Sequence, residues 1–588
     1  MMLWNQLATQ EQGAVRKNHG GKFRFALCYP NFYSIGMANL GFHYVYAALN
    51  AEPDCVCERA FIPMAPDSRR AGLPRRPLTT VESETPVCNF DVLAFSISFE
   101  TDFVHVPEAL RLAHLPPLRS ERNSRHPLVV FGGAAMMLNP EPVADFADVI
   151  LLGDGEELVP ELLEALRSGL DKEGVKAWLH EKPGCYVPER HLASYEGRDI
   201  TTLFGSATPK ASRSGVQSRF DHDLSLRPPH TEIFTPNTEM GDKFLIEVSR
   251  GCPLGCRFCW VGFTYLPPRT FSAASLLAAA AAARRFTRKI GLVATAVCDH
   301  PGIHTILSQL REMEYQISVS SLRMDHITPE FIHYLVSSGE KSIAIAPEVG
   351  SDRLRTIVNK NVSNDQIVQI ARTLFQQGIL NLKLYFMVGL PGETDQDVDA
   401  IATLVGDIKA VVLEHGRKSG RLGNLIISLN CFVPKPNTPF QWAAMESEET
   451  LKARIERVRQ GLRPISNVIL HAPSPREELI QGVLSRGDRR LSSLLLHMDG
   501  NLSGWKKAAR EISFPVMDYL GERTIQSILP WEMIDVGLDK SFLARDYAKS
   551  QAVQATAPCP NVPSCERCGI CETPLVNPIP SPQLEVRN

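Results

Sequence analysis

Three cysteines on one short segment are the residues of this sequence that most directly indicate chemistry. Cys252, Cys256 and Cys259 stand in RGCPLGCRFCWVG, directly after the apolar run FLIEVSR. Three thiolates on one loop can ligate three corners of a 4Fe–4S cluster and leave the fourth iron open to a reactant. Structural zinc takes four ligands and favours paired C-x2-C units, so this spacing favours the iron–sulfur cluster. We therefore expect a catalytic cluster on this loop.

Four more cysteines lie close together near the C-terminus. Cys559, Cys565, Cys568 and Cys571 stand in a short, Pro-rich tail. Four thiols can complete the ligand set of an auxiliary 4Fe–4S cluster or bind zinc tetrahedrally. The C-x2-C-x2-C run is similar to that of bacterial ferredoxins, which favours iron–sulfur and leaves zinc as the alternative. The other seven of the 14 cysteines are scattered, as ordinary core cysteines are.

Apolar runs that alternate with helical patterns predict the elements that position these cysteines. Over residues 23–170 the runs FRFALCYP, DVLAFSIS, PLVVFGG and DVILLGDG are short and bounded by turns. Strands of a buried parallel sheet have this character, and strand–helix alternation gives βαβ units. We expect a Rossmann-like doubly wound sheet within residues 1–205, with a ligand crevice beyond the carboxyl ends of its strands.

Six further runs predict a second α/β unit over residues 241–445. FLIEVSR, KIGLVATA, YQISVSSL, KSIAIAPE, LNLKLYFMVGL and LIISLNCFV are separated by helical patterns. This arrangement fits a partial (β/α)6 barrel whose first strand leads into the cysteine loop. The Ser-, Thr- and Pro-rich segment 206–240 predicts a linker or extended strap. Residues 446–554 predict a mainly helical C-terminal region, and residues 555–588 form the cysteine-rich tail.

Composition places the chain among ordinary globular proteins. It has 588 residues, 44% apolar and 22% charged, with a formal net charge of −3. We therefore expect several domains and no bulk nucleic-acid binding. The N-terminus lacks the features of a signal peptide, and the most apolar stretch, residues 276–283, is too short to span a bilayer. We expect a cytoplasmic protein with no membrane partner, in which clustered cysteines indicate metal ligands.

The cysteine segment resembles the C-x3-C-x-aromatic-C signature of the radical S-adenosylmethionine (SAM) superfamily, in which SAM chelates the open iron. Three later segments resemble further motifs of that superfamily in the same order: IAIAPEVGSDRLR, FMVGLPGET and LNCFVPKPNTPFQW. The resemblance implies that Phe258 lies against the adenine and that Glu348 hydrogen-bonds the ribose. It also implies that the backbone around Gly389, Pro391 and Gly392 meets the adenine.

One motif of the superfamily is missing. Members often carry Gly-Gly-Glu on the second strand to hold the SAM amino group, whereas this sequence reads GLVATAVCDHPG. Cys298, Asp299 and His300 at this strand end are candidates for that contact, and a purely structural turn is the alternative.

The N-terminal unit resembles the cobalamin-binding domains that precede some radical SAM cores. The resemblance lies in FGGAAMMLNPEPVADFADVILLGDGEE, and the domain order with its CERCGIC tail is similar to that of a poorly characterised radical SAM group. No Asp-x-His-x-x-Gly motif occurs in residues 1–200, so a bound cobalamin would lack a protein histidine below cobalt. Gly132, Gly133, Gly153 and Gly155 in the strand-end loops would let a flat ligand approach the backbone. A cofactor-free domain that shapes the substrate site is the alternative.

These observations predict a radical SAM enzyme. The resemblance implies that a reductant such as flavodoxin or ferredoxin reduces the cluster, which cleaves SAM to methionine and a 5′-deoxyadenosyl radical that acts on an unidentified substrate. Cobalamin-dependent methyl transfer is one form of this chemistry. A non-catalytic iron–sulfur carrier or scaffold and a methylthiotransferase-like enzyme are the alternatives. The second is disfavoured because DVLAFSISFE has serine where those relatives carry a cysteine.

Overall fold

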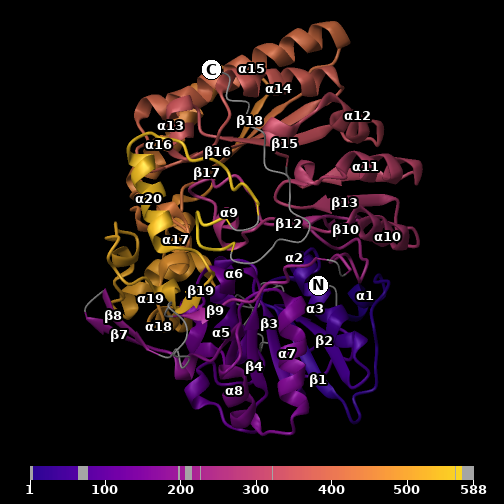
Figure 1. The fold of residues 1–588 in the computed structure, drawn as a ribbon, viewed down its shortest axis with the longest axis vertical. Coiled ribbons are helices and arrows are strands. Elements are labelled where there is room, and N and C mark those ends of the chain that lie inside the picture. Colours follow the sequence, from indigo (N-terminus) through magenta and orange to yellow (C-terminus); the bar gives the residue numbers. More distant parts are fainter. Residues whose placement is uncertain are drawn as a thin grey trace, which may run out of the picture.

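The computed structural model describes residues 4–63, 77–196, 199–204, 215–224, 227–320, 322–562 and 565–571. Figure 1 shows the N-terminal sheet and its helices as the lower half of the molecule, with a second set of strands and helices above it. The C-terminal helices run along one side and contact both halves. This arrangement confirms the predicted α/β fold class.

The N-terminal part folds into a six-stranded sheet in the order β2-β1-β3-β4-β5-β6. Strands β1 to β5 are parallel and β6 is antiparallel to β5. The strands are β1 Phe23–Tyr29, β2 Cys55–Phe61, β3 Val92–Ser96, β4 Leu128–Gly132, β5 Val149–Leu151 and β6 Cys185–Tyr186. The strand order and parallel pairing confirm the predicted doubly wound sheet.

Helices cover both faces of this sheet, which explains why its strands read as continuous apolar runs. In β1, Phe25 and Leu27 pack in one apolar cluster with α3 (Leu40–Ala51) and α7 (Gly155–Arg167), whereas Ala26 packs in another with α5 (His105–Leu112). Helix α3 begins where the Asn39 side chain accepts a hydrogen bond from the Phe42 amide, as a helix N-cap does.

Strand β2 was not predicted from the sequence, because two charged side chains interrupt its apolar pattern. CVCERAF carries Glu58 and Arg59 at its centre, and both are buried. Arg59 forms ion pairs with Glu11 and Glu82 at 2.7 and 2.6 Å, and Glu58 accepts a hydrogen bond from Thr80. Buried charges require such partners, and here the partners come from distant parts of the sequence.

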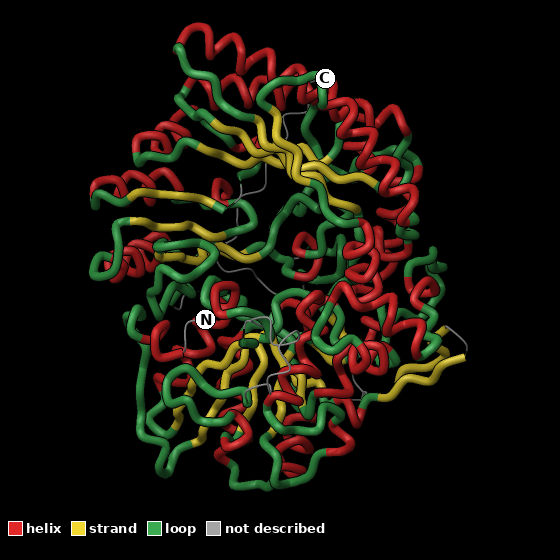
Figure 2. The backbone as a smooth tube through the Cα atoms, turned by 180° about the vertical axis from the view of Figure 1, so that it is seen from behind, coloured by secondary structure: helices red, strands yellow, loops and turns green. Residues whose placement is uncertain are grey.

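All six strands predicted for the second unit are present. A seventh strand, β18, joins them from the C-terminal region, and the seven form two parallel sheets. Strands β10, β13 and β14 form one sheet, and β15, β16, β17 and β18 form the other. The described residues show no strand pairing between β14 and β15, so the partial barrel is split there (Figure 2). The strands are β10 Phe244–Glu247, β13 Lys289–Val293, β14 Gln316–Val319, β15 Ser342–Glu348, β16 Asn381–Val388, β17 Leu425–Cys431 and β18 Val468–His471.

Strand β18 lies in the region predicted to be mainly helical. It has four residues, of which alternate ones are exposed, and it forms the edge of its sheet. So short a pattern is too weak to predict a strand from sequence. The α-helices of this region are α16 Glu448–Leu462, α17 Pro475–Arg486, α18 Leu491–His497, α19 Trp505–Glu511 and α20 Lys540–Gln551.

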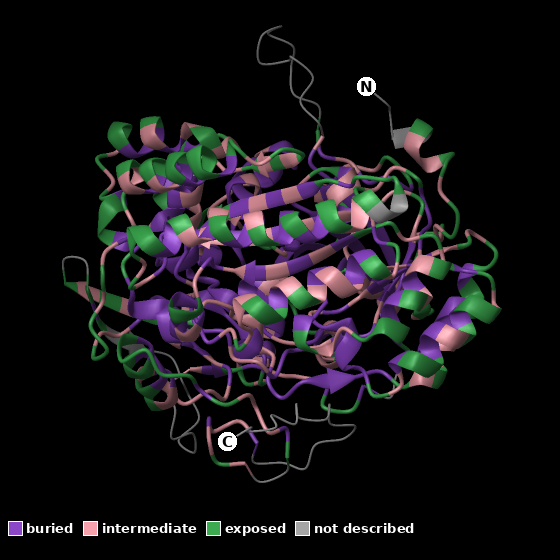
Figure 3. Cartoon of the chain, turned by 90° about the horizontal axis from the view of Figure 1, so that it is seen from above, coloured by how far each residue is buried: buried purple, intermediate pink, exposed green. Residues whose placement is uncertain are grey.

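Helices follow the barrel strands and cover their outer side. Figure 3 shows buried strands behind helices whose outward faces are exposed. None of the described helices is long and apolar enough to cross a membrane. The outer helices are α10 Ala273–Ala283, α11 Ile303–Glu312, α12 Pro329–Ser337, α14 Asn364–Gln376 and α15 Asp395–Ser419.

Segment 206–240 contains no helix in its described part, and residues 205–214 and 225–226 lie outside the described residues. Val216–Gln217 forms β9, which pairs with β19, Ile534–Asp535. Isolated bridges join Arg219 to Gly153 of the N-terminal unit and His230 to Ile246 of β10.

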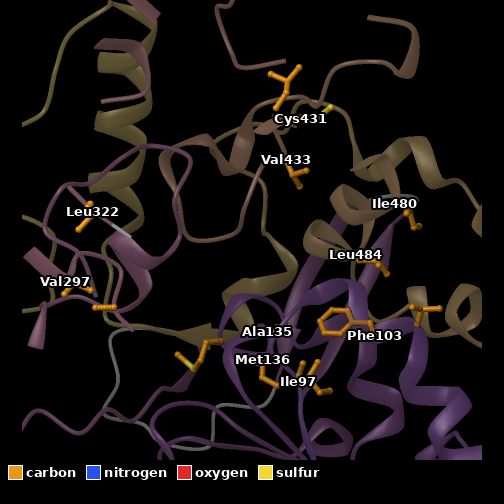
Figure 4. Packing of buried hydrophobic residues seen from close by; sticks show 14 of the residues in the cluster. Ile97, Phe103, Ala135, Met136, Val297, Leu322, Cys431, Val433, Ile480 and Leu484 are labelled. Carbon is orange, nitrogen blue, oxygen red and sulfur yellow. The ribbon is translucent and has the colours of Figure 1, made fainter. Parts of the chain in front are cut away.

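A shared apolar core holds the two halves together. Figure 4 shows Phe103 and Met136 of the N-terminal unit in one cluster with Val433 after β17 and Leu484 of α17. The carboxyl ends of the N-terminal strands therefore face the barrel.

Candidate functional site

The cysteine loop begins at the end of a short hairpin. Ser249–Arg250 (β11) pairs antiparallel with Arg269–Thr270 (β12), and the loop between them carries helix α9, Val261–Thr264. Gly251 has φ +82°, and a Cβ there would lie 2.3 Å from the Tyr265 carbonyl oxygen. Only glycine allows this turn, which folds the cysteine segment back on itself.

The three loop cysteines lie in one buried environment and influence each other. Burial raises the pKa of each thiol, that of Cys256 to about 12, and the neighbouring thiols Cys256 and Cys259 raise the pKa of Cys252 further. Thiols in such surroundings ionise when a metal centre stabilises the thiolates. The donor set therefore fits a cluster with three protein ligands. Among the residues that the structure describes, no three His, Cys, Asp or Glu side chains converge tightly enough to bind a single metal ion.

A largely buried ion pair lies beside this loop, and the sequence analysis did not predict it. Lys360 Nζ donates to Glu348 Oε1 at 3.2 Å, and Glu348 ends β15 with φ +67°. The Lys360 ammonium lowers the pKa of Cys256, and the Glu348 carboxylate raises it. The resemblance implied a SAM contact for Glu348, whereas no sequence motif marked Lys360.

The other SAM-contact candidates lie at the ends of neighbouring strands. Phe258 is half-buried and packs in one apolar cluster with Val349, just after β15, and Leu390, just after β16. Gly389 has φ +87°, and its amide donates to Glu393 Oε2 at 2.6 Å. Pro391 and Gly392 continue this turn, in which Gly392 has φ +74°. The structure thus gathers these motifs around the cysteine loop.

The three candidates after β13 have different surroundings. His300 Nε2 lies 2.7 Å from the Phe271 carbonyl oxygen, and its Nδ1 accepts from the Gly302 amide, so this side chain supports a turn. Cys298 Sγ accepts from the Arg323 amide. Asp299 is bonded at 2.6 Å by the Arg323 guanidinium and adds to the raised pKa of Cys252. Of the three candidates, Asp299 is the one whose charge acts on a cysteine of the loop.

A cavity of about 440 Å³ separates the cysteine loop from the strand ends of the N-terminal sheet. Arg250, Trp260 and Tyr265 line its barrel side. Its other end runs between the sheet and helices α3 and α7, where Leu27, Val45 and other apolar side chains form the walls. The four glycines singled out in the sequence, Gly132, Gly133, Gly153 and Gly155, all line it.

Two of these glycines serve the fold rather than a ligand. A Cβ at Gly133 would lie 2.5 Å from the Ile97 carbonyl oxygen, and one at Gly153 would lie 1.8 Å from that of Arg219. Both have φ above +100°. At Gly132, by contrast, a Cβ would meet nothing closer than Leu151, at 3.9 Å. Gly132 is therefore the position at which a side chain would enter the cavity without disturbing the backbone.

Buried charges fix the rim of the cavity. Arg250 forms ion pairs with Glu156, Glu247 and Asp154 at 2.9, 2.8 and 3.3 Å. Two of these partners belong to the N-terminal unit and Glu247 belongs to the barrel. The pairs therefore hold the two halves in register across the cavity.

The four tail cysteines lie together and against the cysteine loop. All four line one small cavity with Pro253 and Gly255 of that loop. The backbone amide of Cys559 donates to the Pro253 carbonyl oxygen at 2.7 Å. The sequence predicted both cysteine groups, but it gave no sign of this contact between them.

Family models match two parts of this chain. A model described as "Radical SAM proteins, N-terminal" matches residues 41–188, and one described as "Radical SAM superfamily" matches residues 246–405. The second match contains the cysteine loop and the strands up to β16.

Individual proteins resemble the chain over different extents. An uncharacterised protein of Methanocaldococcus jannaschii is 27% identical over 80% of this chain and 90% of its own length. The ribosomal protein uS12 methylthiotransferase RimO of Thermotoga petrophila is 23% identical over 45% of this chain and 65% of its own length. The structure of the radical S-adenosylmethionine methyltransferase TsrM of Kitasatospora setae, with cobalamin and a 4Fe–4S cluster bound, has a TM-score of 0.51 and 13% identity, covering 84% of this chain and 99% of TsrM.

Proposed function

We propose that this chain, a member of the radical SAM superfamily, is a cobalamin-dependent radical SAM methyltransferase. The observation that carries the proposal is the cavity between the N-terminal strand ends and the cysteine loop. A cofactor bound there would adjoin the catalytic cluster. TsrM, which has a similar fold, was determined with cobalamin bound. We also propose the division into residues 1–205, 206–240, 241–445, 446–554 and 555–588.

The lining of the cavity suits cobalamin. The slot between the sheet and helices α3 and α7 is walled by apolar side chains, including Leu158 and Leu162, and suits the flat benzimidazole arm. The end that faces the barrel is lined by Gly132, where a Cβ would find free space, and suits the flat corrin ring. No histidine is among the described residues that line the cavity, so the cobalt would have no histidine ligand from this wall.

Residues around the cysteine loop suit the other cofactors. We propose that Cys252, Cys256 and Cys259 ligate the 4Fe–4S cluster, which supplies low-potential electrons and an open iron. The buried Lys360 ammonium would pair with the SAM carboxylate, and Glu348 would accept a hydrogen bond from the ribose. Asp299 supplies a buried carboxylate where the superfamily's Gly-Gly-Glu is missing, and we propose that it meets the SAM amino group.

The aromatic wall of the cavity gives the reaction a dry site. Trp260 and Tyr265 pack against each other with ring centroids 5.5 Å apart, next to the cysteines in the sequence. We propose that they exclude water between the two cofactor sites, which protects reactive species from side reactions. Cobalamin, when bound, would supply methyl-transfer chemistry. The substrate remains unidentified.

The methylthiotransferase alternative lacks support from the N-terminal cysteines. The three cysteines to consider are Cys28, Cys55 and Cys88. Cys28 lies in β1 and Cys55 in β2, where both are buried, and Cys88 lies in a short helical turn before β3. We therefore do not propose an additional iron–sulfur cluster in the N-terminal unit.

Corrinoid binding tests the proposal. Protein purified anaerobically with hydroxocobalamin should retain a corrinoid through gel filtration, measured by its absorption. Gly132→Val should reduce the retained corrinoid, because a branched side chain would enter the cavity. Gly406→Val is the matched control, since nothing lies within 4 Å of a Cβ at that distant helical position. Wild-type protein that retains no corrinoid would contradict the proposal.

A further inference from the structure

The four tail cysteines lie close together in the folded protein. Cys568 and Cys571 are buried, and Cys559 and Cys565 are partly exposed. All four line one cavity of about 30 Å³. Four cysteine thiols are the number of protein ligands that a 4Fe–4S cluster takes when all four of its irons are ligated.

Hydrogen bonds that do not involve the thiols fold the tail into this shape. Arg567 Nη1 donates to the Pro558 carbonyl oxygen at 2.8 Å. The Asp539 amide, at the start of α20, donates to the Cys568 carbonyl oxygen at 2.8 Å. These two bonds hold the tail next to Cys559 and at Cys568 without using a thiol.

A residue of the cysteine loop itself anchors the tail. Arg257, between Cys256 and Phe258, is fully buried, and its guanidinium donates to Asp546 Oδ1 at 2.9 Å and to the Gln554 carbonyl oxygen at 2.7 Å. The Asn359 side chain donates to the Gly255 carbonyl oxygen at 3.0 Å and accepts from the Thr556 amide at 2.8 Å. The first cysteine loop and the tail are therefore built as one unit.

The tail lies behind the loop, on the side away from the ion pair proposed to bind SAM. Asn359 faces the tail, whereas the next residue, Lys360, bonds Glu348. The space around the tail thiols is lined by the loop at Pro253 and Gly255 and by Gly262 of α9, which the yellow tail passes in Figure 1. A short stretch of backbone, joined to Cys559 by one hydrogen bond, separates the two cysteine groups.

We propose that Cys559, Cys565, Cys568 and Cys571 ligate a second 4Fe–4S cluster that relays electrons to the catalytic cluster. The inference rests on the proposed cluster at the first loop. Zinc has no redox chemistry, so a zinc site would not use the position of the four thiols next to the proposed catalytic cluster. An iron–sulfur cluster at the same place could exchange electrons with it. The relay takes one electron from a reduced flavodoxin- or ferredoxin-class donor and passes it to the first cluster. No bond forms or breaks, and the donor is oxidised by one electron as the first cluster is reduced by one.

The test compares the full-length reconstituted protein with the triple variant Cys565→Ser, Cys568→Ser, Cys571→Ser. Cys88→Ser is the matched control, because Cys88 is partly exposed and belongs to the N-terminal unit. Wild type and control should hold about eight irons per chain and the triple variant about four. None of the three proteins should contain zinc. The SAM-dependent EPR signal of the first cluster should persist in all three proteins.

Electron entry is measured separately from iron content. Reduced flavodoxin should reduce the first cluster in wild type, and this reduction should be lost in the triple variant. Titanium(III) citrate, a small reductant, should reduce it in both. Fully reduced wild-type protein should also show magnetic coupling between two paramagnetic clusters. This measurement needs no variant, so it does not depend on whether the triple variant folds.

Three results would overturn the relay and leave the proposed function standing. One is zinc with about four irons in the wild-type protein. Another is equal reduction by flavodoxin in wild type and variant, and the third is a fully reduced wild type without magnetic coupling. Loss of the SAM-dependent signal in wild type as well would overturn both the relay and the proposed function.

Discussion

The ammonium of Lys360 lies 3.2 Å from the carboxylate of Glu348, beside the cysteine loop. Both groups are largely buried, and each changes the pKa of Cys256 and Cys259. Taking charges out of water is costly, and charged groups with such surroundings gather at functional sites, so this pair is a candidate contact for a charged ligand.

Lys360→Met should weaken SAM binding by at least about tenfold, or about 1.4 kcal/mol. The variant loses the cation proposed to meet the SAM carboxylate. The measurement is the Kd for SAM by anaerobic equilibrium dialysis, with iron content checked in parallel. Lys341→Met is the control, because Lys341 is exposed and lies just before β15, the strand that ends at Glu348. An unchanged Kd in a variant that keeps its cluster would refute the assignment.

Side chains should be rejected at Gly133 and accepted at Gly132. Gly133→Ala places a Cβ 2.5 Å from the Ile97 carbonyl oxygen at φ +103°, and we expect a loss of about 2 kcal/mol or more. At Gly132 an added Cβ would meet only Leu151, at the ordinary contact distance of 3.9 Å, so Gly132→Ala should change stability little. Thermal unfolding midpoints of the two variants provide the comparison. Equal midpoints would show that the backbone contact at Gly133 is unimportant.

Stability should depend on pH through Asp102. Burial raises the pKa of this aspartate to about 7, the nearby Glu100 carboxylate adds to the rise, and a hydrogen bond from Asn31 opposes it. Because the folded pKa exceeds the unfolded value, the favourable contribution of the protonated form is complete below the unfolded pKa, near 3.8. It is lost as the pH rises toward 7.

Asp102→Asn removes this titration. Relative to wild type, the variant should gain stability between about pH 4 and about pH 8, on the order of 2–4 kcal/mol. Thermal unfolding over this range measures the gain, and Asp365→Asn at an exposed position is the control. A difference between wild type and variant that is the same at both pH values would count against the raised pKa.

Much of the fold could be predicted from local patterns. Strands β1, β3, β4 and β5 and the six predicted barrel strands are apolar because they are buried between layers, so their runs stand out in the sequence. Strand β2 could not be predicted, because its charges at Glu58 and Arg59 are neutralised by residues distant in sequence. Strand β18 is a short, half-exposed edge strand and leaves little pattern.

The site divides in the same way. Spacing alone indicated Cys252, Cys256 and Cys259, since loop ligands of a cluster must be close in sequence. Lys360 stands 12 residues beyond Glu348, and their pairing depends on the turn after β15. The contact between Cys559 and Pro253 joins residues about 300 positions apart, so only the fold reveals it.

The most direct test of the account is SAM turnover by the cysteine loop. Anaerobically reconstituted protein, given SAM and dithionite, should form 5′-deoxyadenosine, or S-adenosylhomocysteine as the product of methyl transfer, both measured by liquid chromatography. Replacing Cys252, Cys256 and Cys259 together with alanine should abolish both products, whereas Cys88→Ala should leave them unchanged. Undiminished turnover in the triple variant would contradict the account.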